Sequence, residues 1–195
     1  MTITKTDKFS ASEQGLGYIY QARLALLHLL QLPEDTAVFL EKDDDLDFID
    51  VGGGKSLASL KHKAVGDRLA DLSTDFWKSV NIWLERYKRD GRSASNLQFF
   101  LFTTGTVSSG SFLARLLPYK SVPSGDLETL TEQANASLAK SRSQLIAPIT
   151  ASFNELSEPE KQDFLERILI LDGSPRIDDI PSIIRDKHMR SIRRD

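Results

Sequence analysis

Apolar residues recur at steps of three and four in two segments, which predicts amphipathic helices over residues 12–31 and 70–90. The expected buried stripe of the first helix consists of Leu16, Tyr20, Leu24, Leu27 and Leu30. That of the second helix consists of Leu72, Phe76, Val80, Trp83 and Tyr87. Ser10 and Glu13 have the spacing of a capping box at the start of the first helix, and Gly91 is placed to end the second.

Between and after these helices the pattern changes to short strands. Residues 37–42, 46–51 and 56–63 favour three strands, and the triplet Gly52–Gly54 predicts a hairpin turn between the last two. Residues 97–103 (LQFFLFT) are so uniformly apolar that we expect a central strand covered on both faces. The remaining chain is expected to form helices at about 108–117, 126–143, 158–167 and 178–192, with a short strand at 168–172.

The order helix–strand–strand–strand–helix–strand predicts an α/β fold, in which a mixed sheet is flanked by helices and followed by extra C-terminal helices. A chain of 195 residues fits one domain. The last segment, RDKHMRSIRRD, keeps a helical pattern up to the final residue. We therefore expect residues 1–195 to be one domain at the N-terminus of a longer protein.

The composition excludes several classes of protein. The chain contains no cysteine, which rules out disulfide scaffolds, thiolate zinc sites and cysteine nucleophiles. No apolar run has the length of a membrane span, and the N-terminus lacks the hydrophobic segment of a signal peptide, so a cytoplasmic protein without a membrane partner is expected. The net charge of −3 is unusual for a free-standing DNA-binding protein.

Three residues at predicted strand ends could carry chemistry. Glu41 ends one strand, Asp45 opens the next, and Lys61 lies near the end of the third, on the same strand face as Ser59. The predicted hairpin would bring Asp45 to Asp47 close to Ser59 and Lys61. One or two carboxylates suffice to hold Mg²⁺ or Mn²⁺ against a phosphate, and a lysine can steady the charge that develops during hydrolysis.

Simpler interpretations of these residues stay open. An acidic run such as 43–45 is typical of a solvated turn, and Lys61 alone would be an exposed strand lysine. Asp47 and Asp50 are expected at the surface, although Asp47 is the best substitute ligand if Asp45 does not bind metal. Side chains expected to serve structure are the capping residue Glu13 and the packing residues Trp77 and Trp83.

Four segments of the chain resemble one nuclease family. They are GLGYIYQARLALLHLL (15–30), FLEKDDDLDF (39–48), SLKHK (59–63) and FFLFTTG (99–105). The sequence resembles the PD-(D/E)xK double-stranded-DNA endonuclease effectors of CBASS-type antiphage defence, which also occur as N-terminal nuclease domains of antiviral STAND NTPases. The residues that match its helix start are Gly17, Tyr20 and Gln21.

The resemblance implies a restriction-endonuclease-like fold and a Mg²⁺- or Mn²⁺-dependent endonuclease acting on double-stranded DNA with little sequence selectivity. Glu41 and Asp45 match the metal-binding acids and Lys61 the catalytic lysine, whereas Ser59 stands where the family has Gln or Glu. The residues we expect to contact the DNA backbone are Lys63, Arg68, Arg86, Lys88 and Arg89. Gln21 could either reach the site from the first helix and contact DNA, or pin that helix to the sheet.

The expected partners are duplex DNA and either a downstream sensor domain or further copies of the chain. Two other hypotheses remain. The domain could be a catalytically silent DNA-binding or assembly module, as the serine at position 59 would suit, or a nuclease acting on RNA.

Overall fold

The computed structural model describes residues 11–119 and 128–192, and the chain divides into two compact units. The helical unit consists of Met1–Glu34 and Pro175–Asp195, and the sheet unit consists of Asp35–Ser174. In the described parts, no helix combines the length and the apolar character needed to cross a membrane.

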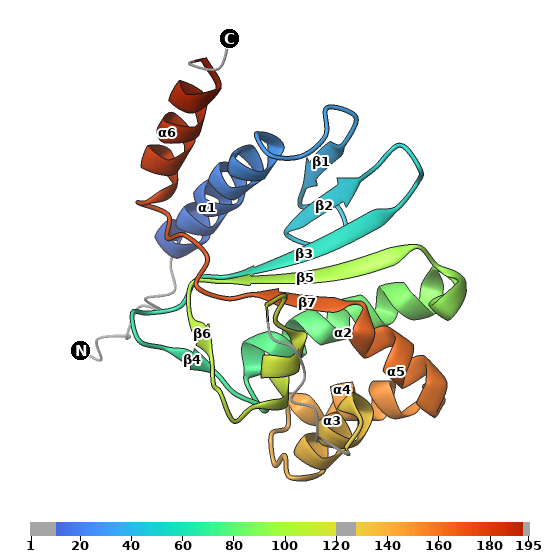
Figure 1. Ribbon diagram of the computed structural model, residues 1–195. Coiled ribbons are helices and arrows are strands. Elements are labelled where there is room, and N and C mark those ends of the chain that lie inside the picture. Colours follow the sequence, from blue (N-terminus) through green and yellow to red (C-terminus); the bar gives the residue numbers. More distant parts are fainter. Residues whose placement is uncertain (1–10, 120–127, 193–195) are drawn as a thin grey trace, which may run out of the picture. The chain divides into compact units, whose positions relative to one another are not determined.

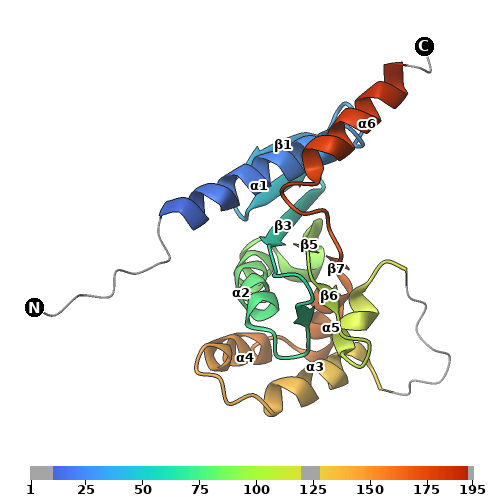
Figure 2. The same ribbon diagram turned by 90° about the vertical axis from the view of Figure 1, so that its left-hand side faces the viewer.

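The helical unit is a pair of helices from opposite ends of the sequence, α1 (Ala11–Leu29) and α6 (Ile180–Ile192), which contact each other (Figure 2). The Tyr20 hydroxyl donates to the carbonyl oxygen of Pro175 at 3.1 Å, and Arg23 donates to that of Ile177 at 2.7 Å. Both helices lie where the sequence predicts them. The predicted cap at Ser10 lies outside the described residues.

The set of residues predicted to be buried in the first helix is wrong at both ends. Tyr20, Leu24 and Leu27 are buried, but Leu16 and Leu30 are exposed by 54% and 47%. Leu30 follows the last helical residue. Leu16 lies one turn before Tyr20, where the hydrogen bonds to the segment after residue 174 begin.

The sheet unit follows the predicted order of elements (Figure 1). Its strands are β1 (Ala37–Leu40), β2 (Leu46–Ile49), β3 (Lys55–Lys61), β4 (Arg68–Leu69), β5 (Leu97–Thr103), β6 (Thr106–Val107) and β7 (Ile168–Leu171). Its helices are α2 (Thr74–Arg89), α3 (Leu130–Ala139), α4 (Ile146–Asn154) and α5 (Glu158–Glu166), with 3₁₀ turns η1 (Arg92–Ala94) and η2 (Phe112–Leu116).

Five strands form one mixed sheet in the order β1-β2-β3-β5-β7, which confirms the predicted α/β class. β1, β2 and β3 are antiparallel neighbours, whereas β3, β5 and β7 run parallel. The glycine hairpin is confirmed: Gly53 has φ 79°, and its N–H donates to the carbonyl oxygen of Asp50. A two-stranded ribbon, β4 with β6, follows the ends of β3 and β5.

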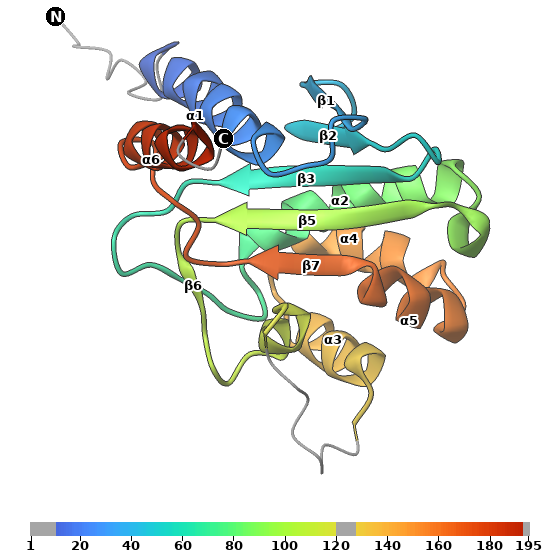
Figure 3. The same ribbon diagram turned by 45° about the horizontal axis from the view of Figure 1, so that its top comes forward.

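The core lies on the face of the sheet that α2 and α5 cover (Figure 3). Trp83 of α2 stacks on Phe99 of β5 at 5.4 Å between ring centroids, and Phe164 of α5 lies at 5.4 Å from the same Phe99 ring. Trp77 and Trp83 are fully buried, which confirms that both serve packing. Leu97, Phe99, Leu101 and Thr103 are all buried on this face, while on the opposite face Gln98 is exposed.

Several C-terminal predictions need correction. Residues 112–116 form a 3₁₀ turn, because the Ser111 hydroxyl and the Phe112 amide both donate to Asp71 and tie this segment to the loop before α2. Within the predicted helix over 126–143, the structure has α3 over Leu130–Ala139. The helix α4 is not predicted by the sequence pattern. Its Pro148 lies in the first helical turn, where a proline removes no helical hydrogen bond.

Candidate active site

The candidate residues lie at the end of the sheet where the carboxyl ends of the parallel strands meet. Lys61 is the last residue of β3 and lies beside Thr103, the last residue of β5. Because β2 runs antiparallel to β3, the loop of residues 41–45 that joins β1 to β2 lies at this same end. Ligands of open α/β sheets bind at this kind of edge.

The backbone of the loop brings Glu41 and Asp45 together. The Glu41 N–H donates to the carbonyl oxygen of Asp45 at 3.1 Å, so the backbones of the two acidic residues lie side by side at the mouth of the hairpin. Glu41 has φ 52°, a left-handed conformation that non-glycine residues adopt rarely and that is found preferentially at functional sites. The Glu41 side chain is exposed and that of Asp45 is partly buried.

A second hydrogen bond connects this loop to the strand of Lys61. The Leu60 N–H donates to Asp45 Oδ2 at 2.6 Å, which fixes the Asp45 carboxylate beside the residue preceding Lys61. Lys61 is partly buried, and its ammonium forms no ion pair or hydrogen bond with the residues that the structure describes. The three predicted residues are therefore brought to one place.

Asp47 is buried, so its predicted position at the surface is wrong. Its side chain has no exposed area, and Oδ1 accepts the N–H groups of Asp43 and Asp44 at 3.3 and 3.2 Å. Its Oδ2 lies 3.1 Å from the ammonium of Lys55. Asp47 therefore stabilises the conformation of the loop, because Oδ1 accepts two loop N–H groups and Oδ2 faces the Lys55 ammonium. Asp50 is exposed, as predicted.

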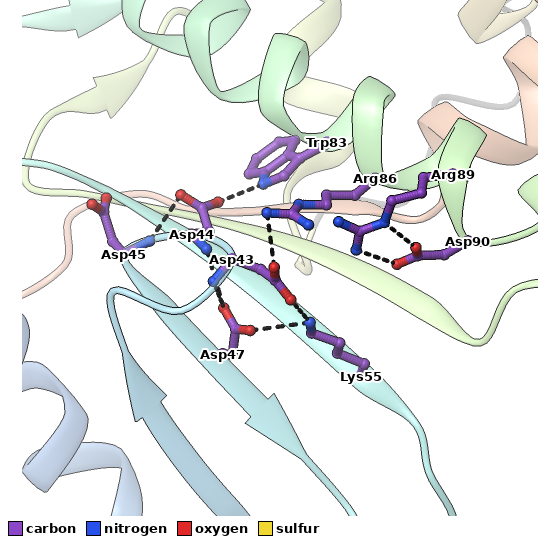
Figure 4. A network of polar contacts seen from close by, with 9 residues as sticks. All are labelled: Asp43, Asp44, Asp45, Asp47, Lys55, Trp83, Arg86, Arg89 and Asp90. Atoms are coloured by element: carbon purple, nitrogen blue, oxygen red, sulfur yellow. Dashed lines mark hydrogen bonds and ion pairs between the residues drawn. The ribbon is translucent and has the colours of Figure 1, made fainter.

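Asp43 is neutralised by two cations from different elements (Figure 4). Lys55 of β3 contacts its Oδ2, and Arg86 of α2 lies 2.7 Å from its Oδ1. The hydrogen bond from Lys55 holds the pKa of the Asp43 carboxyl below its ordinary value. Lys55 thus bridges Asp43 and Asp47 and ties the acidic loop to the sheet.

Asp44 is held by neutral donors only. The Ser59 hydroxyl lies 2.8 Å from both carboxylate oxygens. Trp83 Nε1–H donates to Oδ2 at 2.7 Å, and the Asp45 N–H donates to Oδ1 at 2.9 Å (Figure 4). Burial raises the pKa of the Asp44 carboxyl, and the three kinds of hydrogen bond offset only part of this effect. The acidic run is therefore docked against α2 and β3, and the solvated-turn interpretation is wrong.

The donor set suits a cation that keeps several waters. Nowhere in residues 11–119 and 128–192 do three carboxylate or imidazole side chains converge as a cage for a metal ion. Glu41 and Asp45 nevertheless offer hard oxygen ligands at one loop mouth, and Mg²⁺ is commonly bound by one or two carboxylates, with water and phosphate completing its shell. A partly open Mg²⁺ site at this loop would therefore have Glu41 and Asp45 as its protein ligands.

Most of the basic residues predicted to contact DNA are paired with acids of the protein. Arg86 binds Asp43, and the remaining pairs are Lys63 with Asp75, Lys88 with Glu155, and Arg89 with Asp90. Arg68, in β4, is exposed, and its guanidinium has no ion pair or hydrogen bond within the described residues. Gln21 belongs to α1 of the helical unit.

The buried Asp47 carboxylate should be required for stability. Asp47→Ala leaves two loop amides without their acceptor and removes one partner of Lys55. We expect a loss of about 3 kcal/mol in the free energy of unfolding, measured by urea denaturation. Glu85→Ala removes an exposed acid of α2 and should change stability by less than about 0.5 kcal/mol. Equal stability of the two variants would contradict the anchoring role of Asp47.

Comparison with known proteins gives a distant structural likeness. No protein-family model matches the sequence, and no curated protein does. Among solved structures, the chain is similar to the Moraxella osloensis Cap4 SAVED/CARF-domain containing receptor, with a TM-score of 0.45 and 19% sequence identity. The match covers 88% of this chain and 36% of the receptor chain. A likeness at this level says nothing about activity.

Proposed function

We propose that the sheet unit is a divalent-metal-dependent endonuclease that hydrolyses phosphodiester bonds of double-stranded DNA with little sequence selectivity. The observation that carries this proposal is the hydrogen bond from the Leu60 amide to Asp45 Oδ2. It fixes the Asp45 carboxylate, a group of the kind that binds Mg²⁺, beside the residue that precedes Lys61. The Lys61 ammonium forms no ion pair or hydrogen bond with the described residues. The sequence resemblance assigns the same residues to this chemistry.

In this proposal Glu41 and Asp45 hold Mg²⁺ or Mn²⁺. The bound ion would supply Lewis acidity toward the phosphate and an acidified water. The Lys61 ammonium would stabilise the charge that develops on the phosphate oxygens. Lys61 can serve this purpose because its ammonium forms no ion pair with an acid among the described residues.

Non-selective action on duplex DNA fits the sparse basic surface. Contacts with phosphates position a duplex without reading its bases. Of the five basic residues predicted to make such contacts, only Arg68 lacks an intramolecular ion pair among the described residues. We expect weak binding by this chain alone, so a sensor domain or further copies would be needed to add contacts. A role in antiphage defence is part of the proposal and rests on the sequence resemblance.

Cleavage of supercoiled plasmid DNA tests the proposed activity. We expect nicking and linearisation in the presence of Mg²⁺ or Mn²⁺ and none with excess EDTA. Duplex RNA of matched length separates a DNA nuclease from an RNA nuclease. Binding of DNA without any cleavage in either metal would favour the catalytically silent module instead.

A further inference from the structure

Thr104, the residue after β5, binds the backbone of the segment that begins with Lys61. The Thr104 N–H donates to the carbonyl oxygen of Lys61 at 3.2 Å. The Thr104 hydroxyl accepts the Lys63 N–H at 2.7 Å and donates to the Lys63 carbonyl oxygen at 3.1 Å. One residue therefore contacts the backbone on both sides of His62.

The Thr104 hydroxyl stands where a parallel ladder would have a backbone acceptor. β3 and β5 are parallel, with Lys61 beside Thr103. If the ladder continued, the Lys63 N–H would meet the carbonyl oxygen of Thr104. It meets the hydroxyl instead, and the strand that follows, β6, pairs with β4. A side chain thus extends the pairing beyond Lys61, the last residue of β3.

The same segment is packed closely at Lys63. A Cβ atom at Gly105 would lie 3.2 Å from Cγ of Lys63 and 2.9 Å from the carbonyl oxygen of Asp67, so only glycine allows this approach. The Lys63 ammonium is paired with Asp75 of α2. Lys63 is therefore fixed at its backbone, at its aliphatic stem and at its charged end.

Thr104 is itself fixed by the segment that follows β7. The carbonyl oxygen of Thr103 accepts the Ser174 N–H, and that of Gly105 accepts the Gly173 N–H, both at 2.9 Å. The Thr103 hydroxyl also accepts the Gly105 N–H at 3.2 Å. Because the backbone on both sides of Thr104 is tied in this way, its hydroxyl can orient the end of β3.

We infer that Thr104 is a positioning residue for Lys61, which it orients by binding the end of β3 through its hydroxyl. This inference rests on the proposed function, in which Lys61 stabilises charge on the phosphate. A group with that role must be held within about 0.5 Å of its productive position. Lys61 is at a strand end, where backbone pairing on one side stops, and the Thr104 hydroxyl supplies the missing support.

Hydrogen exchange tests this support without an activity assay. Thr104→Val has nearly the shape of threonine but lacks the hydroxyl, so the Lys63 amide loses its acceptor. We expect the exchange rate of the Lys63 amide, followed by NMR, to rise by about tenfold or more. Thr104→Ser keeps a hydroxyl and should restore slow exchange.

The matched control is Thr106→Val. Thr106 is an exposed threonine of β6, and its hydroxyl forms no hydrogen bond with the described residues. This variant should leave the exchange of the Lys63 amide and the rate of DNA cleavage unchanged.

Single-turnover cleavage of plasmid DNA in Mg²⁺ then tests the positioning of Lys61. Thr104→Val should cleave about 10- to 100-fold more slowly than the wild type, as for a small misplacement of a group that acts in the transition state. Its affinity for duplex DNA, measured by fluorescence anisotropy in EDTA at low salt, should be unchanged. Thr104→Ser should recover most of the lost rate.

Circular dichroism shows whether each variant is folded at the assay temperature. If Thr104→Val does not fold, Thr104→Ala removes the hydroxyl with less bulk and is compared with Thr104→Ser in the same way. Unchanged exchange of the Lys63 amide, wild-type cleavage by the variant without the hydroxyl, or equally slow cleavage by Thr104→Ser would each overturn the inference. The nuclease proposal survives these outcomes if the wild type cleaves in Mg²⁺. If the wild type cleaves in neither Mg²⁺ nor Mn²⁺, both fall.

Discussion

Lys61→Ala should lower the rate of DNA cleavage by about two orders of magnitude or more, the range for removing one group that stabilises a transition state. The thermal stability should stay close to that of the wild type, because the Lys61 ammonium forms no ion pair or hydrogen bond with the described residues. The measurement is the single-turnover rate of plasmid cleavage in Mg²⁺, combined with thermal unfolding followed by circular dichroism.

Lys78→Ala provides the control for Lys61. Lys78 is an exposed lysine of α2, and its replacement removes the same charge from the sheet unit at a position outside the acidic loop. Its cleavage rate should remain within about twofold of the wild type, since no transition-state contact is removed. If Lys61→Ala cleaves as fast as Lys78→Ala, Lys61 is only a strand lysine.

Phe99→Ala should destabilise the protein strongly, and by at least as much as Asp47→Ala. Phe99 is fully buried in β5, between the rings of Trp83 and Phe164. Its removal should cost about 3–5 kcal/mol, because the transfer free energy of the ring is lost and a cavity remains between three elements. For a protein of this size, the melting temperature should fall by roughly 10 °C.

Gln98→Ala, at the exposed neighbouring position of the same strand, should change the free energy of unfolding by less than about 0.5 kcal/mol. Urea denaturation of both variants gives the comparison. A loss below about 1 kcal/mol for Phe99→Ala would mean that the stacked rings do not form a packed core.

The elements predicted correctly are those whose pattern is local. The glycine triplet at 52–54 fixes a hairpin by the backbone freedom that Gly53 uses, and the apolar run of 97–103 has no stable place except inside a sheet. The stripe from Phe76 to Tyr87 required no knowledge of its partners, because a helix with one apolar face buries that face whatever covers it.

The elements that were missed depend on distant contacts. β4 and β6 are two residues each and pair only because β3 and β5 place them side by side. The 3₁₀ turn at 112–116 depends on Asp71, some 40 residues earlier in the chain. The proline at position 148 disfavours a helix unless it falls in the first helical turn. Where α4 starts depends on its packing against α2, which the sequence does not reveal.

The candidate site shows the same limit. Hairpin register alone was enough to bring Asp45 to the strand of Lys61. By contrast, Asp44 and Asp47 looked like turn residues, since nothing local indicates that Trp83, 39 positions away, donates to Asp44. The burial of Asp47 could have been predicted from the strand pattern. Asp47 lies between Leu46 and Phe48 in a strand, so its side chain points to the face opposite theirs, where it contacts Lys55.

The central claim is that the carboxylates at this hairpin mouth support hydrolysis of DNA through a divalent cation. Its most direct test is the rate of plasmid cleavage in Mg²⁺ by the wild type and by Asp45→Asn, which keeps an oxygen to accept the hydrogen bond from Leu60 but loses the charge. We expect cleavage by the wild type that stops on addition of EDTA, and none by the variant. Cleavage that persists in excess EDTA, or equal rates for the two proteins, would contradict the claim.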